Sequence, residues 1–279
     1  MDSYRAVRRV RVDGGLTIVG DLHGKLGALE AVLAELGVEA GLAAGTHTLI
    51  SLGDLVDRGP REERDGRVVY TGVEALVDRF AALERRYPDR VFAVLGNHEV
   101  MHLRDVKTRA LAPGGVSRWG SQGELGLTAE RLAWLRGLPI ALELEAHGTR
   151  AVVVHAGVSE RPFALDTLAD VARIEDLVTR HDAERPLREL VWTNPTWSRG
   201  VSGFAFLYTR IHLAAFLEKN AAQVLIRGHH DEPEIRDLGG GKHFVCVHTA
   251  QGKTDRDVPA DGYVYATWDG GRTPALVKR

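Results

Sequence analysis

The sequence has little cysteine, no long apolar run and almost no excess of charge of either sign. Its 279 residues include one cysteine, Cys246, so an internal disulfide is impossible, which fits a reducing compartment. No stretch approaches the roughly 20 apolar residues that a membrane-spanning helix needs. The charged segment over residues 1–15 lacks the apolar run of a signal peptide. We therefore expect a cytoplasmic protein that does not act at a membrane.

The balance of charge argues against a nucleic-acid-binding surface. The chain carries 36 basic and 38 acidic residues, a formal net charge of -2, whereas nucleic-acid binders are usually basic. Its composition, 44% hydrophobic and 27% charged, is ordinary for a globular protein. A chain of this length can form one large α/β domain, and we predict a single domain over residues 1–279. The oligomeric state is not indicated.

Short apolar runs alternate with helical patterns along the first half of the chain. Apolar runs predict strands at residues 16–19, 48–52, 91–95 and 151–154, and helical spacing predicts helices at 28–36 and 73–83. Because the strand runs are uninterrupted rather than alternating, we expect strands buried on both faces. Alternation of strand and helix predicts a layered α/β domain.

The C-terminal half has a different pattern. We predict strands near residues 224–226, 234–238, 243–248 and 262–267, with a hairpin turn at Gly239-Gly240-Gly241. This half therefore favours an antiparallel, β-rich arrangement. One α/β/β/α sandwich with two mixed sheets accommodates both halves. Patterning is weakest over residues 105–126.

Polar residues cluster where the predicted strands end. The strand-end motifs are GDLHG at 20–24, GDLVDRG at 53–59, GNHE at 96–99, HAG at 155–157 and GHH at 228–230. Ligands of open α/β sheets bind just beyond the carboxyl ends of the strands. We therefore expect these five turns to converge on one cleft.

The residue types in these turns are those of a divalent-metal centre. Carboxylate, carboxamide and imidazole groups suit manganese, iron or zinc, and the turns offer no thiolate. We predict one site from Asp21, His23 and Asp54 and a second from Asp54, Asn97, His155 and His229. Two ions sharing Asp54 would lie about 3.5–4 Å apart and acidify a shared water molecule.

Together the five motifs resemble the calcineurin-like metallophosphoesterase superfamily. Within it, GDLVDRG and GNHE are similar to the PPP phosphoprotein phosphatases, and all five motifs occur in the order of that family. The match favours His229 over His230 as a ligand, because His229 directly follows Gly228. The resemblance implies the metallophosphoesterase fold, a phosphatase activity and two divalent ions, with manganese preferred in vitro and iron or zinc also compatible.

The resemblance also implies roles for residues beside the metals. Arg58 and Arg199 match the two arginines that grip the substrate phosphate, and a planar guanidinium suits that task because it binds two oxygens at once. His98 matches the general acid, and Asp57 matches the aspartate that orients it. The predicted catalytic residues are His98, Asp57, Arg58 and Arg199, and the predicted substrate-binding residues are Arg58, Asn97, His98 and Arg199.

Some positions depart from the PPP pattern. Asn194 stands where the family usually has aspartate, Ala156 replaces a glycine, and residues 248–252 lack the tyrosine of the family's C-terminal loop. The segments at 96–103 and 192–195 are more similar to bacterial or Shewanella-like PPP enzymes, some of which prefer phosphotyrosine. We expect Glu99 to support the site, for example by orienting Arg58. Histidines outside the motifs, among them His102 and His248, are expected to be exposed or locally hydrogen-bonded.

These features predict a metal-dependent phosphomonoesterase, a phosphoprotein phosphatase in particular. The expected reaction is direct attack on phosphorus by a hydroxide bridging the two metals, with a phosphorylated protein or small phosphoester as substrate. One alternative is a dinucleoside polyphosphate hydrolase, which shares the metal motifs but usually carries GNHD. Another is a binding module that kept the fold and lost catalysis. The presence of every expected ligand and of His98 argues against that module.

Overall fold

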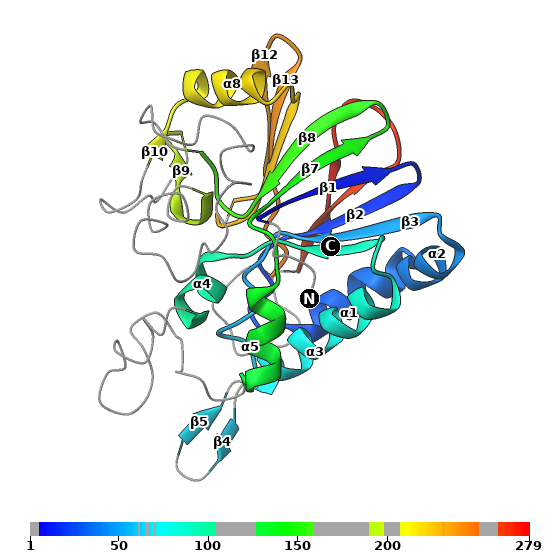
Figure 1. Ribbon diagram of the computed structural model, residues 1–279, viewed down its shortest axis with the longest axis vertical. Helices are drawn as coiled ribbons and strands as arrows, with labels where there is room; N and C mark the ends of the chain where they lie inside the picture. Colours follow the sequence, from blue (N-terminus) through cyan, green and yellow to red (C-terminus); the bar gives the residue numbers. More distant parts are fainter. Residues whose placement is uncertain are drawn as a thin grey trace.

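The protein is built from two mixed β-sheets that face each other, with helices on both outer sides (Figure 1). The computed structural model describes residues 6–60, 62–64, 67–69, 71–103, 127–158, 190–197, 207–230, 232–250 and 262–279. This α/β/β/α layering is the predicted fold class. Among the described residues, no helix combines the length and the apolar character needed to cross a bilayer.

One sheet has five strands in the order β15-β14-β2-β3-β6. Its strands are β2 (Gly15–Val19), β3 (His47–Ser51), β6 (Val91–Ala93), β14 (Val264–Trp268) and β15 (Ala275–Lys278). Strands β2, β3 and β6 are parallel, whereas β14 is antiparallel to both of its neighbours. The carboxyl ends of the three parallel strands therefore meet at one edge.

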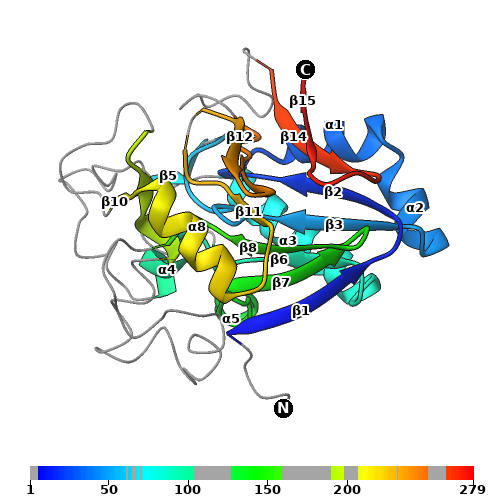
Figure 2. The same cartoon turned by 90° about the horizontal axis from the view of Figure 1, so that it is seen from above.

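The other sheet has six strands in the order β1-β7-β8-β11-β13-β12. Its strands are β1 (Val7–Val12), β7 (Ala141–Ala146), β8 (Thr149–Val154), β11 (Val224–Arg227), β12 (Glu234–Gly239) and β13 (Lys242–Cys246). Strand β11 is parallel to both β8 and β13. These three strands therefore also end together, and Figure 2 shows β8 and β11 lying side by side.

Helices and two small ribbons complete the described structure. The helices are α1 (Leu26–Glu35), α2 (Val38–Ala44), α3 (Thr71–Arg86), α4 (Asn97–Leu103), α5 (Ala129–Arg136) and α8 (Arg210–Lys219). Helices α1, α2 and α3 cover the five-stranded sheet, and α8 lies over the six-stranded one (Figure 1). The ribbons pair β4 (Glu62–Arg64) with β5 (Arg67–Val69) and β9 (Asn194–Pro195) with β10 (Leu207–Tyr208).

Successive residues of strand β2 are buried on opposite faces of its sheet. Leu16 and Ile18 belong to the core between the two sheets, while Val19 packs in the core under the helices. Thr17, which faces the same side as Val19, is also buried, and its hydroxyl bonds to the His47 ring at 2.8 Å. Since both faces are covered, the uninterrupted apolar run is explained, and the prediction of doubly buried strands is confirmed.

Two expectations about the strands were wrong. A strand, β1, precedes the first one predicted, because an edge strand tolerates arginines alternating with valines. The C-terminal half is only partly antiparallel, since β11 pairs in parallel on both sides. The hairpin turn at Gly239-Gly240-Gly241 is confirmed, as it joins the antiparallel strands β12 and β13.

Candidate metal centre

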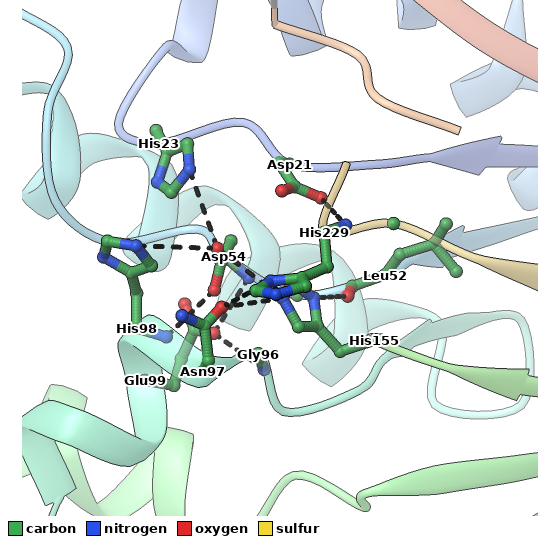
Figure 3. Close-up of polar contacts among 12 residues, drawn as sticks. Asp21, His23, Leu52, Asp54, Gly96, Asn97, His98, Glu99, His155 and His229 are labelled. Carbon is green, nitrogen blue, oxygen red and sulfur yellow. Dashed lines mark hydrogen bonds and ion pairs between the residues drawn. The ribbon is translucent and has the colours of Figure 1, made fainter. Parts of the chain in front are cut away.

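The five motif turns converge on the carboxylate of Asp54 (Figure 3). The Oδ2 atom of Asp54 lies 3.6 Å from the Nε2 atom of His23 and 3.6 Å from that of His155. The Nε2 atom of His98 is 3.9 Å from the same oxygen. All four side chains are buried. Asp54 thus stands between imidazoles that come from different turns and from both sheets.

Among the described residues, two groups of side chains could each hold a metal ion. One consists of His23, Asp54 and His98, and the other of Asp54, His155 and His229, each with ligand atoms within 4.8 Å of one another. Asp54 belongs to both groups. The first group differs from the predicted site, because it contains His98 in place of Asp21.

Hydrogen bonds fix which nitrogen of two histidines faces the centre. The Nδ1 atom of His23 donates to the carbonyl of Val56 at 3.0 Å, and that of His155 donates to the carbonyl of Leu52 at 2.7 Å. Because a carbonyl only accepts, both Nδ1 atoms carry the proton, and in the neutral rings both Nε2 lone pairs point toward Asp54. Burial, followed by the charge of Arg58, holds the pKa of His23 well below its usual value. A neutral imidazole is the form that binds metals.

Three atoms that could bind a metal meet on the second side of Asp54. The Nε2 atom of His155 lies 2.9 Å from Oδ1 of Asn97 and 3.2 Å from Nδ1 of His229, which is 3.1 Å from Asn97 Oδ1. If the Asn97 amide is rotated, its nitrogen instead donates to both rings and to Asp54. With its oxygen toward the rings and Nδ1 of His229 unprotonated, the three atoms form a set of lone pairs that a cation satisfies. The donor set therefore fits a divalent ion.

Asp21 lies beside the centre and belongs to neither group of metal-compatible residues. Its Oδ1 atom accepts a hydrogen bond from the backbone N–H of His229 at 3.0 Å, and its Oδ2 atom is 3.4 Å from Nδ1 of His248. Burial would raise the pKa of Asp21, but the facing ring of His248, followed by His155 and His23, holds it well below its usual value. The turn is tight, since a Cβ at position 228 would lie 2.4 Å from this carboxylate.

His248 is a residue of the site that the sequence interpretation missed. It was expected to be exposed or locally bonded, yet it is buried and contacts Asp21. It lies two residues beyond the end of β13, whereas His155 directly follows β8. The strand-end rule could have identified it, because a polar residue there falls at the same edge of the sheet.

Glu99 holds the turn that carries Asp54. Its Oε2 atom accepts from the backbone N–H groups of Gly96 at 2.8 Å and Asp54 at 2.9 Å, and its Oε1 atom accepts from those of Leu55 at 2.7 Å and Val56 at 3.2 Å. Burial, with the nearby charge of Asp54, raises the pKa of Glu99. The expectation that Glu99 orients Arg58 is corrected, because its carboxylate binds backbone amides instead.

Several residues of these turns have left-handed backbone conformations. The φ angles are 47° for His23, 55° for Asp54, 67° for Asp57 and 59° for Arg58. Such values are uncommon for residues other than glycine, and they persist only where surrounding contacts fix them. The four amide bonds to Glu99 provide such contacts for the Asp54 turn.

Asp57 joins two histidines of helix α4. Its Oδ2 atom accepts from Nδ1 of His98 at 2.5 Å, and its Oδ1 atom accepts from Nε2 of His102 at 2.7 Å. Burial lowers the pKa of His98. The charge of Asp54 opposes this shift, and the charge of Arg58 adds to it. The predicted pairing of Asp57 with His98 is present in the geometry. His102, expected to be exposed or locally bonded, is buried in contact with Asp57 instead.

Of the two predicted phosphate-binding arginines, one lies among the residues that the structure describes. Arg58 is half-buried and close enough to influence His23 and His98. Arg199 lies outside the described residues, as do residues 105–126 and 251–261. Asn194, the substituted aspartate position, accepts from Nη2 of the fully buried Arg227 at 3.1 Å.

Facing mixed sheets with aspartate and histidine side chains gathered at their strand ends are the arrangement of the metallophosphoesterase fold. The chain belongs to the calcineurin-like phosphoesterase family, whose model matches residues 16–233. Members of this family use a centre of two metal ions. The described groups around Asp54 provide residues suited to such a centre.

Similar proteins include phosphatases. The catalytic subunit of serine/threonine-protein phosphatase 4 from Kluyveromyces lactis is 26% identical over 222 residues. These cover 78% of this chain and 63% of that protein, so this chain spans less than two thirds of the relative's length.

Solved structures share the fold. A serine/threonine phosphatase from Saccharomyces cerevisiae, similar to human phosphatase PP5, superposes with a TM-score of 0.69 at 17% identity, covering 98% of this chain and 83% of that one. A putative diadenosine tetraphosphatase superposes with a TM-score of 0.53 at 22% identity, covering 99% of this chain and 98% of that one.

Proposed function

We propose that the chain is a metal-dependent phosphomonoesterase that acts on phosphoproteins. The observation that carries the proposal is that Asp54 belongs to two metal-compatible groups, one of which contains His98, the partner of Asp57. Similarity to protein phosphatases over 78% of the chain supports the choice of substrate class. Serine or threonine phosphoesters are the first expectation, and tyrosine phosphoesters the second.

The proposed metal ligands are Asp21, His23, Asp54, Asn97, His155 and His229. Two divalent ions bound there would neutralise phosphate charge and bring the pKa of a bound water near neutrality. Manganese is the first choice in vitro, with iron and zinc also compatible with these ligands. The tautomers of His23 and His155 favour this role, because each ring presents a lone pair to the centre.

The remaining residues would handle the phosphate and the leaving group. Arg58 would bind phosphoryl oxygens, and Arg199 would be its partner. His98 would donate a proton to the departing alkoxide from Nε2, because Asp57 holds its Nδ1 atom. A strongly basic leaving group needs this proton more than a weakly basic one does. Single-domain organisation over residues 1–279 and a cytoplasmic location stay predictions.

Hydrolysis of dinucleoside polyphosphates is the second candidate function. The likeness to a putative diadenosine tetraphosphatase extends over 99% of this chain and 98% of that one, so the two share the whole fold. The motif GNHE at residues 96–99 favours the protein-phosphatase alternative, since the dinucleotide hydrolases usually carry GNHD.

The test compares four substrates after chelation and after manganese is restored. The substrates are 4-nitrophenyl phosphate, a phosphothreonine peptide, a phosphotyrosine peptide and diadenosine tetraphosphate. We expect manganese-dependent release of phosphate from a phosphopeptide. Turnover of the dinucleotide alone would assign the second function. Absence of turnover with manganese, iron or zinc would contradict both and support a binding module.

A further inference from the structure

Helix α4 places two histidine rings against a single carboxylate. His98 and His102 are four residues apart, so they lie on one face of the helix, one turn from each other. Each ring hydrogen-bonds to a different oxygen of Asp57: Nδ1 of His98 to Oδ2 at 2.5 Å, and Nε2 of His102 to Oδ1 at 2.7 Å. All three side chains are buried, with 7% of the His98 side chain, 5% of that of His102 and 2% of that of Asp57 exposed.

The chemistry of these contacts sets the direction of each hydrogen bond. An ionised carboxylate only accepts, so Nδ1 of His98 and Nε2 of His102 both donate. With one ring on each oxygen, rotation of the carboxylate about its Cβ–Cγ bond would break both bonds. His102 therefore restrains the orientation of the Asp57 carboxylate and, through it, the ring of His98.

The orientation of the Asp57 carboxylate needs support from side chains, because the backbone of its turn has an uncommon conformation. Asp57 has a left-handed φ of 67° in a turn between β3 and β4. Helix α4, in contrast, is regular and is tied to the centre by the bond from the His98 N–H to Oδ1 of Asp54 at 3.0 Å. His102 thus links the side chain of a strained turn to a rigid helix.

We propose that His102 is a positioning residue for the leaving-group proton donor. It fixes the Asp57 carboxylate so that Nε2 of His98 faces the departing oxygen. The inference rests on the proposed function, in which His98 donates that proton. His102 itself does not touch the substrate in this account.

The test uses the basicity of the leaving group. Phenyl phosphate releases phenolate, whose conjugate acid has a pKa of about 10, as for tyrosine, whereas 4-nitrophenolate is much less basic and needs little protonation. For His102→Ala we expect kcat to fall roughly tenfold on phenyl phosphate and about twofold on 4-nitrophenyl phosphate, a part of the usual effect of general acid catalysis. Loss of folded protein alone would lower both rates by the same factor.

Two further variants separate positioning from a structural effect. His102→Gln keeps an N–H donor at a similar reach and should restore most of the rate on phenyl phosphate. In a His98→Asn background, His102→Ala should change that rate by less than about twofold, because residues acting through one another are not additive.

The outcomes distinguish this inference from the proposed function. Equal losses on both esters, or a full additional loss in the His98→Asn background, would overturn the role of His102 while the phosphatase assignment stands. If the unaltered protein with manganese hydrolyses neither ester, the proposed function fails and the inference fails with it. A selective, Gln-rescued loss on phenyl phosphate supports both.

Discussion

The two sheets contribute different kinds of residue to the candidate metal centre. The turns after β2, β3 and β6 supply Asp21, His23, Asp54 and Asn97, whereas the ends of β8, β11 and β13 supply His155, His229 and His248. The first side is rich in oxygen donors and the second consists of imidazoles. Imidazoles bind metals in their neutral form, so the negative charge that favours a divalent cation comes from the carboxylates of the first side.

The two sides also differ in how the side chains are held. On the five-stranded side, Glu99 binds the backbone amides of the Asp54 turn. Left-handed backbones occur on both sides, at His23 and Asp54 and also at His229. On the six-stranded side, strand hydrogen bonds continue into the turn, as in the bond from Gly228 N–H to the carbonyl of His155 at 2.8 Å. We infer that changes in the Asp54 turn affect both folding and metal binding, whereas loss of the His229 ring affects mainly metal binding.

The largest expected effect follows from removing the shared carboxylate. We expect Asp54→Asn to lower kcat on 4-nitrophenyl phosphate by about 10³-fold or more, some 4 kcal/mol in activation free energy. The reason is that Asp54 belongs to both metal-compatible groups. Metal content per chain should fall for both ions. Asp13→Asn, at an exposed position on the surface, is the matched control and should leave kcat unchanged.

Next in size is the loss of the Glu99 carboxylate. Glu99→Gln replaces one acceptor oxygen by an N–H₂ group facing backbone donors, so we expect the free energy of unfolding in urea to fall by about 3 kcal/mol without metal. Glu30→Gln is the control, because Glu30 forms a partly exposed pair with Arg79 and should cost less than about 1 kcal/mol. Equal effects of the two substitutions would contradict the clamp role of Glu99.

A third prediction contrasts a histidine from each side. His23→Ala and His229→Ala should each weaken binding of one metal ion, by about 100-fold. In the metal-free protein, His23→Ala should also lower the free energy of unfolding by about 1 kcal/mol, because its bond to the Val56 carbonyl is lost. His229→Ala should leave it nearly unchanged, since the backbone N–H that binds Asp21 is kept. Metal analysis and urea unfolding measure the two quantities.

The smallest effect concerns an ion pair far from the centre. Arg131 binds Asp78 with two hydrogen bonds, of 2.8 Å and 2.6 Å, and these lower the pKa of Asp78 below its usual value of 3.8. A lowered pKa means that the stabilisation is present above about pH 4 and is lost as the pH falls further. At pH 7 Asp78→Asn should cost less than about 1 kcal/mol, because the pair is partly exposed. In urea unfolding, the cost should shrink as the pH falls below about 4.

The strands that lead into the five motif turns, and the convergence of those turns, could be predicted from the sequence. The apolar runs before Asp21, Asp54 and His155 are uninterrupted because both faces of those strands are covered. The rule that ligands gather at strand ends then placed these residues together, as observed. Strand β1 was not predicted, because its arginines interrupt the apolar pattern at the edge of the sheet.

Contacts between distant segments could not be predicted. His102 lies 45 residues from Asp57, and the short pattern around it carries no sign of that partner. Glu99 follows His98 in the motif, but its four bonds go to amides, groups that every residue except proline carries. Side-chain identity in a motif therefore indicated the chemistry of the centre, while the supporting contacts depended on the folded geometry.

The most direct test of the account is a manganese titration of the chelated protein. Bound manganese per chain and hydrolysis of 4-nitrophenyl phosphate would be measured on the same samples, with Asp54→Asn alongside. The account predicts that activity appears as the second equivalent binds, and that Asp54→Asn neither binds two ions nor becomes active. Full activity with one equivalent, or activity that survives chelation, would contradict a centre in which two ions share Asp54.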